Sequence, residues 1–347
     1  MTAVRFDNVS IVFGEKPGIA LPLMDAGQDR AEIQQATGQV LGVHNCSLDV
    51  AEGEILVLMG LSGSGKSTLL RAVNGLNPVV RGGVTIRDRD WSATLPGCSE
   101  ADLRRVRREC VSMVFQQFGL LPWRTVRDNV GLGLELAGMG KADIRRQVEE
   151  QLALVSLSDW SDRKVGELSG GMQQRVGLAR AFVTNAPILL MDEPFSALDP
   201  LIRARLQDEL LDLQKQLKRT IIFVSHDLDE AFKLGNRIAI MEGGRIVQCG
   251  TPQQIIAQPA NDYVADFVAH MNPLSVLTAV DVMVPDTDGP ADAPSVPDDT
   301  PLATVMETML DGPDQVMVER DGAPVGRIRK DDVLRGLLDP QGTGAPT

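Results

Sequence analysis

A glycine-rich segment that also carries a lysine and four hydroxyl residues is the stretch of the sequence best suited to chemistry. It reads GLSGSGKST over residues 60–68, between an apolar run and a helical run, and this pattern is typical of a phosphate-binding loop. Glycines let the backbone wrap a triphosphate so that its N–H groups point at the charge. We expect the whole segment to bind nucleotide: Gly60, Leu61, Ser62, Gly63, Ser64, Gly65, Lys66, Ser67 and Thr68.

Two adjacent carboxylates, Asp192 and Glu193, end another apolar run at residues 188–192. If the phosphate-binding loop opens at the same sheet edge, both carboxylates face the nucleotide. We expect Asp192, together with Ser67, to hold Mg²⁺, and Glu193 to accept a proton from a water aligned on the γ-phosphate. The pattern therefore predicts hydrolysis of a nucleoside triphosphate, although the loop alone would also suit a kinase, a GTPase or a motor.

Two further polar residues, Gln116 and His226, follow the apolar runs 111–115 and 220–225. Parallel topology would bring them to the same edge as the carboxylates. We expect His226 to reach the γ-phosphate, and Gln116 to touch Mg²⁺ or the attacking water. Gln117 is the alternative to Gln116 at this stage.

A second glycine motif, LSGGMQQR, occupies residues 168–175 ahead of a helical run. Ser169 suits a helix N-cap, so the motif predicts a second anion-binding helix terminus. One nucleotide has little use for both this terminus and the loop at residues 60–68 of the same chain. We therefore expect two copies of the chain to share two nucleotides in a head-to-tail pair.

The apolar runs predict the elements that must position these residues. Continuous apolar strands are expected where helices cover both faces of a parallel sheet, which indicates an α/β fold. An edge hairpin at 237–249 and two antiparallel strands at 4–13 and 44–51 are expected beside this sheet, with a polar insertion at 14–42 between the latter two. Helices are expected at 102–110, 141–157, 172–182 and 203–217.

Composition excludes several function classes. The net charge of −13 is the wrong sign for nucleic-acid binding. The four cysteines form no C-x-x-C pair, which argues against a zinc site or a disulfide framework. No apolar run reaches the roughly 18–20 residues of a membrane span, and the first residues do not resemble a signal peptide. We expect a protein of a reducing cytosol.

A change in composition after residue 272 predicts a domain boundary. Residues 273–300 are rich in Pro, Asp and Gly, as flexible linkers are. Periodicity returns at 301–338, with a helix, two short strands and a closing helix. A unit of this size seldom folds without a staple or a partner.

The order of these motifs resembles that of the ATP-binding-cassette (ABC) ATPases over residues 4–272. The resemblance implies a P-loop NTPase cassette in residues 1–272, with a parallel-sheet core, an antiparallel β subdomain and a helical subdomain at about 101–180. It also implies ATP and Mg²⁺ as cofactors, Gln116 as a metal ligand beside Ser67 and Asp192, Glu193 as the base and His226 as the γ-phosphate sensor.

The same resemblance assigns the remaining site residues. Ser169, Gly170 and Gly171 would contact the ATP of a partner subunit, and Asp199 would lie at the dimer seam. Phe13 would stack on adenine, with Phe6 as the alternative. Residues 118–122 would pass the nucleotide state from Gln116 to a membrane subunit, unless the apolar side chains here are simply core.

Within this family, the insertion at 14–42 and the stretches 113–126 and 200–231 are similar to the quaternary-amine uptake group. This resemblance implies a peripheral subunit on the cytoplasmic face of the bacterial inner membrane. Its partners would be transmembrane permease subunits and, indirectly, a periplasmic substrate-binding protein. Choline is the expected cargo and glycine betaine or proline betaine the alternative. A soluble cassette acting on nucleic acid and a small-molecule kinase are the rival functions.

Residues 301–338 resemble a single cystathionine-β-synthase (CBS) motif. The resemblance rests on VMVE at 316–319, PVGR at 324–327 and DDVL at 331–334. Because such motifs normally pack in pairs, the resemblance implies pairing between two subunits. A degenerate spacer is the alternative.

Overall fold

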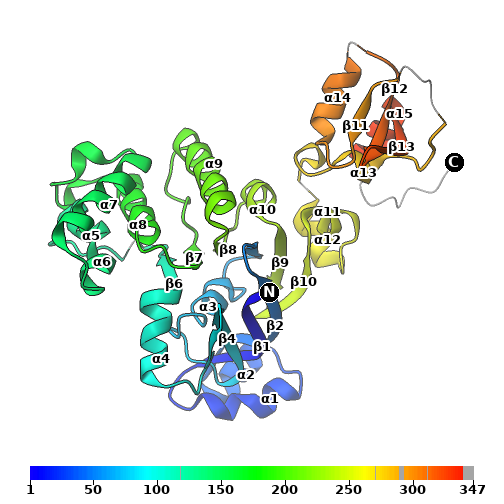
Figure 1. Cartoon of the computed structure of the whole chain (residues 1–347). Coiled ribbons are helices and arrows are strands. Elements are labelled where there is room, and N and C mark those ends of the chain that lie inside the picture. The colour runs from blue at the N-terminus through cyan, green and yellow to red at the C-terminus, as the bar shows by residue number, and fades with distance from the viewer. Residues whose placement is uncertain (118, 270, 289–292, 311, 339–347) are drawn as a thin grey trace. The chain divides into compact units, whose positions relative to one another are not determined.

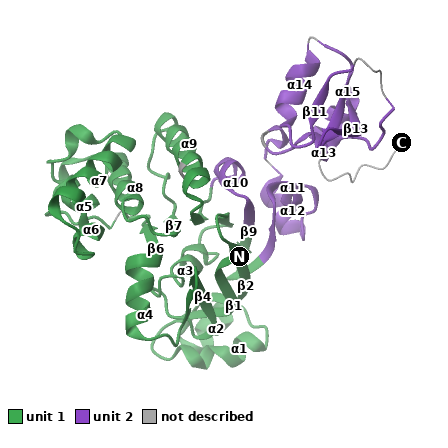
Figure 2. Cartoon of the chain, in the orientation of Figure 1, with its two compact units in different colours: residues 1–226, 239–246 green, residues 227–238, 247–347 purple. Residues whose placement is uncertain are grey.

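The computed structural model describes residues 1–117, 119–269, 271–288, 293–310 and 312–338 (Figure 1). The chain divides into two compact units (Figure 2). The first holds residues 1–226 and 239–246, and the second holds residues 227–238 and 247–347. Among the described residues, no helix combines the length and the apolar character needed to cross a membrane.

A six-stranded sheet has the order β10-β9-β3-β8-β7-β6, and its strands β3, β8, β7 and β6 form the centre of the first unit. Neighbouring strands from β3 to β6 run parallel, and every residue of β3, β7 and β8 is buried. The predicted parallel core is therefore confirmed. The strands are β3 (Ile55–Met59), β6 (Val111–Val114), β7 (Ile188–Asp192), β8 (Thr220–Val224), β9 (Arg237–Glu242) and β10 (Arg245–Gly250).

An antiparallel sheet, in the order β2-β1-β4-β5, forms the second layer of this unit. Its strands are β1 (Thr2–Phe13), β2 (Val40–Ala51), β4 (Arg81–Asp88) and β5 (Trp91–Leu95). The insertion between β1 and β2 folds into a 3₁₀ turn (Pro17–Ala20) and two helices, α1 (Leu21–Asp25) and α2 (Arg30–Thr37). Met24 and Ile33 pack there with Val12 and Leu41 in a small apolar cluster. The polar insertion is thus a folded helical segment that packs on β1 and β2 through this cluster.

The helices of the first unit fall into two sets. Some lie against the sheet, and the others form a separate group. The glycine-rich loop leads into α3 (Lys66–Leu70), and the long α9 (Pro200–Leu217) precedes β8. The group comprises α5 (Val126–Val130), α6 (Leu132–Leu136), α7 (Lys141–Leu154) and α8 (Gly170–Phe182), which pack against one another (Figure 1). The helix expected at 102–110 is present, and its second half is π-helical: α4 (Glu100–Arg105) continues directly into a π-helical turn at Val106–Cys110.

The second unit begins with three short helices and ends in a small α/β fold. The helices are α10 (Leu228–Leu234), α11 (Pro252–Ala257) and α12 (Asp262–Val268). The α/β fold contains the sheet β11-β12-β13. Its elements are α13 (Ala279–Val282), β11 (Ser295–Pro297), α14 (Leu302–Leu310), β12 (Gln315–Arg320), β13 (Ala323–Arg329) and α15 (Lys330–Leu338).

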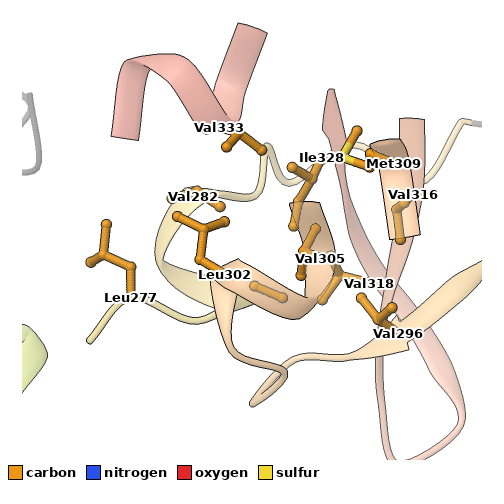
Figure 3. Close-up of a cluster of buried hydrophobic side chains, with 11 residues drawn as sticks. Leu277, Val282, Val296, Leu302, Val305, Met309, Val316, Val318, Ile328 and Val333 are labelled. Carbon is orange, nitrogen blue, oxygen red and sulfur yellow. The ribbon is translucent and has the colours of Figure 1, made fainter. Parts of the chain in front are cut away.

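The range 273–300, expected to be a linker, supplies part of this C-terminal fold. Leu277 and Val282 are buried in the same core as Leu302 and Val333, and β11 adds a parallel strand to β12 (Figure 3). The physical reason is size, since the 301–338 segment alone has too little apolar surface to bury. The Pro- and Asp-rich composition concealed these apolar anchors. A packed core also argues against a degenerate spacer in this region.

Two leucines of α14 give a matched test of this core. Leu302 is fully buried, whereas Leu310 is 77% exposed. We expect Leu302→Ala to lower the free energy of unfolding of the C-terminal fold by about 2–5 kcal/mol, because it leaves a cavity. Leu310→Ala should change it by less than about 0.5 kcal/mol. Urea unfolding followed by hydrogen exchange in residues 295–338 measures both, and equal losses would contradict the packing described.

Candidate nucleotide-binding and hydrolysis site

A cavity of about 540 Å³ opens beside the glycine-rich loop in the first unit. Its lining residues come from the insertion, from β1 and β2, from the loop and α3, and from the segments that follow β6, β7 and β8. They are Phe13, Arg30, Val40, Leu41, Gly42, Ser62, Gly63, Gly65, Lys66, Ser67, Thr68, Gln116, Glu193 and His226. The structure thus brings the expected loop, base and sensor residues to one cavity.

The loop and its lysine are held by the loop's own backbone. Lys66 begins α3 and is only 6% exposed. Its ammonium donates hydrogen bonds to the carbonyl oxygens of Gly60 (2.8 Å) and Leu61 (2.9 Å). Burial lowers the pKa of Lys66, and the nearby Glu193 and Asp192 carboxylates counter this shift. A polyanion entering the cavity would meet a cation whose hydrogen bonds, within the described part of the chain, go to two neutral carbonyl oxygens.

Asp192, the last residue of β7, is fully buried. Its carboxylate accepts hydrogen bonds from Ser67 in α3 and from Arg71, the residue that follows α3. Ser67 Oγ donates to Asp192 Oδ1 (2.6 Å), and Arg71 donates to Oδ2 through Nη2 (2.8 Å) and Nε (3.2 Å). A hydroxyl and a carboxylate side by side are hard oxygen donors. Mg²⁺ is usually bound through one or two carboxylates plus substrate phosphates, so this donor set fits that ion.

Glu193 lies at the meeting point of the two polar side chains that the sequence analysis singled out. Gln116 Nε2 donates to Glu193 Oε2 (3.1 Å), and His226 Nδ1 lies 3.4 Å from the same oxygen. The register of β6, β7 and β8 explains this convergence, because the parallel strands end together and the three residues follow their ends. Gln116 contacts the carboxylate of Glu193; no contact with Ser67 or Asp192 is recorded for it.

The backbone of Glu193 adopts the left-handed conformation, with φ of 48°. Such a conformation is strained for a residue with a side chain and tends to persist where surrounding contacts enforce it. Gln174 of α8 is 1% exposed, and its Nε2 donates to the Glu193 carbonyl oxygen (3.1 Å). Its Oε1 accepts from the N–H of Ala197 (3.1 Å). One buried amide therefore fixes the loop after β7 to the helix of the LSGGMQQR motif.

Three residues of the glycine-rich loop lie outside the cavity lining. A Cβ on Gly60 would come within 2.1 Å of the Met241 carbonyl oxygen, so only glycine fits against β9 here. Leu61 is 62% exposed, and Ser64 is buried. Their part is in the shape of the loop and, for Gly60 and Leu61, in holding Lys66.

Ser169 and Asp199, which are expected to contact the ATP of a partner subunit or the dimer seam, are N-caps of two helices that begin outside this cavity. Ser169 is the N-cap of α8, with its side chain accepting from Met172, and Asp199 is the N-cap of α9, accepting from Ile202. Nothing lies within 4 Å of a Cβ built on Gly170, whereas one on Gly171 would meet the Ala197 carbonyl at 3.2 Å. Within one chain, residues 168–175 contribute nothing to the described lining of the cavity.

Phe13 and Phe6 differ sharply in environment. Phe13 is 38% exposed and lines the cavity, whereas Phe6 is 2% exposed within the core. Only Phe13 has a face that a base could reach. Of the segment expected to signal to a membrane subunit, Phe118 lies outside the described residues.

Three side chains at this site were missed by the sequence analysis: Arg30, Arg71 and Gln174. Arg71 and Gln174 lie beside residues to which the sequence analysis gave roles. Their own hydrogen-bond partners, Asp192 and Glu193, are distant in sequence, so no local pattern predicts these contacts. Arg30 follows Asp29, whose capping box with Glu32 begins α2. The D-x-x-E capping pattern at residues 29–32 predicts the start of a helix, and it would have placed Arg30 in the first turn of that helix.

The chain matches known proteins along most of its length. Residues 43–196 match the family model described as ABC transporter. The glycine betaine/carnitine transport ATP-binding protein GbuA of Listeria monocytogenes is 47% identical over 82% of this chain and 70% of its own. The glycine betaine/proline betaine ATP-binding protein ProV of Escherichia coli is 48% identical over 80% and 69%. The trimethylamine N-oxide transport system ATP-binding protein TmoW of Ruegeria pomeroyi is 46% identical over 78% of this chain and 78% of its own.

The fold has solved counterparts as well. The dimeric structure of MJ0796, a bacterial ABC transporter cassette, superposes with a TM-score of 0.62 at 29% identity, covering 72% of this chain and 98% of that one. The same cassette has been solved in a post-hydrolysis state with ADP and phosphate. With the motifs in place around one cavity, the chain belongs to the ATP-binding proteins of ABC transporters and is a transport ATPase.

Proposed function

We propose that this ATPase energises uptake of a small, fully methylated amine osmolyte. The proposal rests on the relatives, whose names specify glycine betaine, proline betaine, carnitine and trimethylamine N-oxide as cargo, and on the hydrolytic geometry around Glu193. Transmembrane permease subunits and an external substrate-binding protein would complete the importer, with this chain bound at the cytoplasmic side of the membrane. Choline remains a cargo candidate through the resemblance of the insertion at 14–42 and the stretches 113–126 and 200–231 to the quaternary-amine uptake group, within which the choline importers are the expected match.

In the proposed reaction, Lys66 leaves its carbonyl partners and binds the outer phosphates of ATP. Ser67 and Asp192 would hold Mg²⁺, which supplies charge neutralisation at the phosphates. Glu193 accepts the proton of a water aligned on the γ-phosphate. Gln116 and His226, both near Glu193 Oε2, orient that carboxylate and the water beside it. Phe13, which lines the same cavity, stacks on adenine.

Two copies of the chain are proposed to complete each other's sites. The support is that Ser169 and the two glycines after it are exposed or half-buried at a helix N-terminus, outside the cavity of their own chain. A helix N-terminus favours an anion, and a head-to-tail pair would bring this one to the partner's ATP. Asp199 would then lie at the seam between the copies.

The C-terminal fold is proposed to pair with that of the partner subunit, as a single CBS-like motif would. The CBS resemblance itself stays a prediction. The packed core formed around α14 and β12 supports a folded accessory unit.

Cargo identity is best tested in the assembled importer. We expect proteoliposomes that contain this chain with its permease and binding protein to hydrolyse ATP faster when glycine betaine is present, and to accumulate the labelled compound. Choline is the second arm of the same assay. Stimulation by DNA, with no response to any methylated amine, would contradict the proposal and favour a cassette that acts on nucleic acid.

Replacing the proposed base should separate binding from hydrolysis. We expect Glu193→Gln to lower the hydrolysis rate by about 100-fold or more, the usual range for loss of a general base, while ATP binding is kept and the closed dimer accumulates. Lys66→Ala is the matched control and should lose ATP binding itself. Phosphate release, equilibrium nucleotide binding and size-exclusion chromatography measure these effects, and retained hydrolysis in Glu193→Gln would refute the assignment.

The buried amide of Gln174 should matter for rate rather than for ATP binding. We expect Gln174→Ala to lower kcat by about tenfold or more, because the loop that carries Glu193 loses its fixed position, with KM for ATP changed less than about twofold. Gln173 is the control, since its side chain donates to the Leu168 carbonyl (3.1 Å) and, among the described residues, makes no bond to the loop that carries Glu193. A similar fall in kcat in Gln173→Ala would show that the helix, and not the Gln174 contact, is responsible.

A further inference from the structure

The helical insertion between β1 and β2 is built to hold one side chain at the nucleotide cavity. Asp29 and Glu32 form a reciprocal capping box at the start of α2, with distances of 2.8 and 2.9 Å. At the other end, Gly38 closes the helix with φ of 69°. Both ends of α2 are therefore fixed, and Arg30 lies in its first turn, where it lines the cavity.

The guanidinium of Arg30 joins two segments of the site. It donates to the carbonyl oxygen of Gly63 in the glycine-rich loop and, through Nη2, to that of Gly42 in β2 (2.6 Å). A Cβ on Gly244 would come within 3.0 Å of the same Nη2, so the turn between β9 and β10 closes over it. Through these two hydrogen bonds of Arg30, the insertion connects the phosphate-binding loop to β2 of the antiparallel sheet.

Arg30 has a charge that the described part of the chain does not neutralise. Its contacts in the site are with carbonyl oxygens, and burial lowers its pKa. The Nε atom is buried without a hydrogen-bond partner among the described residues. Arg81, which faces the same insertion, pairs instead with Asp25 at 2.7 Å. A partly buried cation bonded only to neutral acceptors gains from an anion nearby, and the adjacent cavity is the proposed place of the triphosphate.

We propose that the insertion is a working part of the nucleotide site and that Arg30 is a positioning residue for ATP. Arg30 fixes Gly63, and through it the amide cradle that receives the phosphates, and adds a second positive charge beside that of Lys66. Its contribution is to nucleotide affinity rather than to the hydrolytic step, because Glu193 and the carboxyl ends of β7 and β8 are not among its contacts. This inference rests on the proposed nucleotide site.

The test compares three variants of the full chain: Arg30→Met, Arg30→Lys and Arg81→Met. We expect Arg30→Met to weaken Mg-ATP binding about tenfold, the loss typical of one charge-assisted contact, and to raise KM in parallel while kcat changes less than about twofold. Arg30→Lys keeps the charge and should recover part of the affinity. Arg81→Met removes the Asp25 ion pair that ties the insertion to β4 and should leave affinity for ATP unchanged.

The outcomes separate a positioning role from a structural one. Unchanged affinity in Arg30→Met would overturn the inference, and so would an equal loss in Arg81→Met, which would implicate the attachment of the insertion alone. A fall in kcat at constant KM would overturn it as well. If Arg30→Met fails to fold, Arg30→Gln and Arg30→Lys carry the same comparison. If Lys66→Ala also retains full ATP binding, the proposed site itself is wrong, not only the role of Arg30.

Discussion

The buried carboxylate of Asp192 is the constraint on which the rest of the site depends. A fully buried charge is tolerated only when it is paired and hydrogen-bonded. Here Ser67 of the glycine-rich loop and Arg71, just after α3, provide both. The contact fixes the start of α3 against the end of β7. Ser67, the first turn of α3 and the end of β7 are therefore positioned together, because a shift of Ser67 or Arg71 would leave Asp192 uncompensated.

Strain at the next residue extends this arrangement to the helical group. Glu193 has a left-handed backbone, and its carbonyl oxygen accepts from both Gln174 and Ser196 (3.0 Å). Gln174 belongs to α8, whose first turn carries the LSGGMQQR motif. One buried side chain thus connects the loop of the proposed base to the helix whose N-cap is Ser169. A movement of α8 would be transmitted directly to the loop that carries Glu193.

Local patterns predicted the central strands well, and the polar residues expected at the ends of β6, β7 and β8 do lie close together. Strands β3 and β7 match their apolar runs to the residue, because a continuous buried strand leaves a clear signal. The contacts of Arg30 and Arg71 could not be predicted, since their partners lie 12 to 121 residues away and depend on tertiary packing. The error at 273–300 has a different cause. Composition suggested a linker, whereas a few spaced residues such as Leu277 and Val296 were enough to join the core.

One chain carries every part of the proposed reaction except closure around the nucleotide. Phe13, Lys66 and Glu193 share one cavity, yet the N-terminus of α8, with its LSGGMQQR motif, lies outside the lining of that cavity. A lone subunit would leave the triphosphate exposed to water on one side, where charge stabilisation is weak. A second copy that supplies Ser169 would both exclude water and add a helix dipole. Hydrolysis would then depend on dimer closure, which is how ATP chemistry can be made to drive movement of an attached membrane partner.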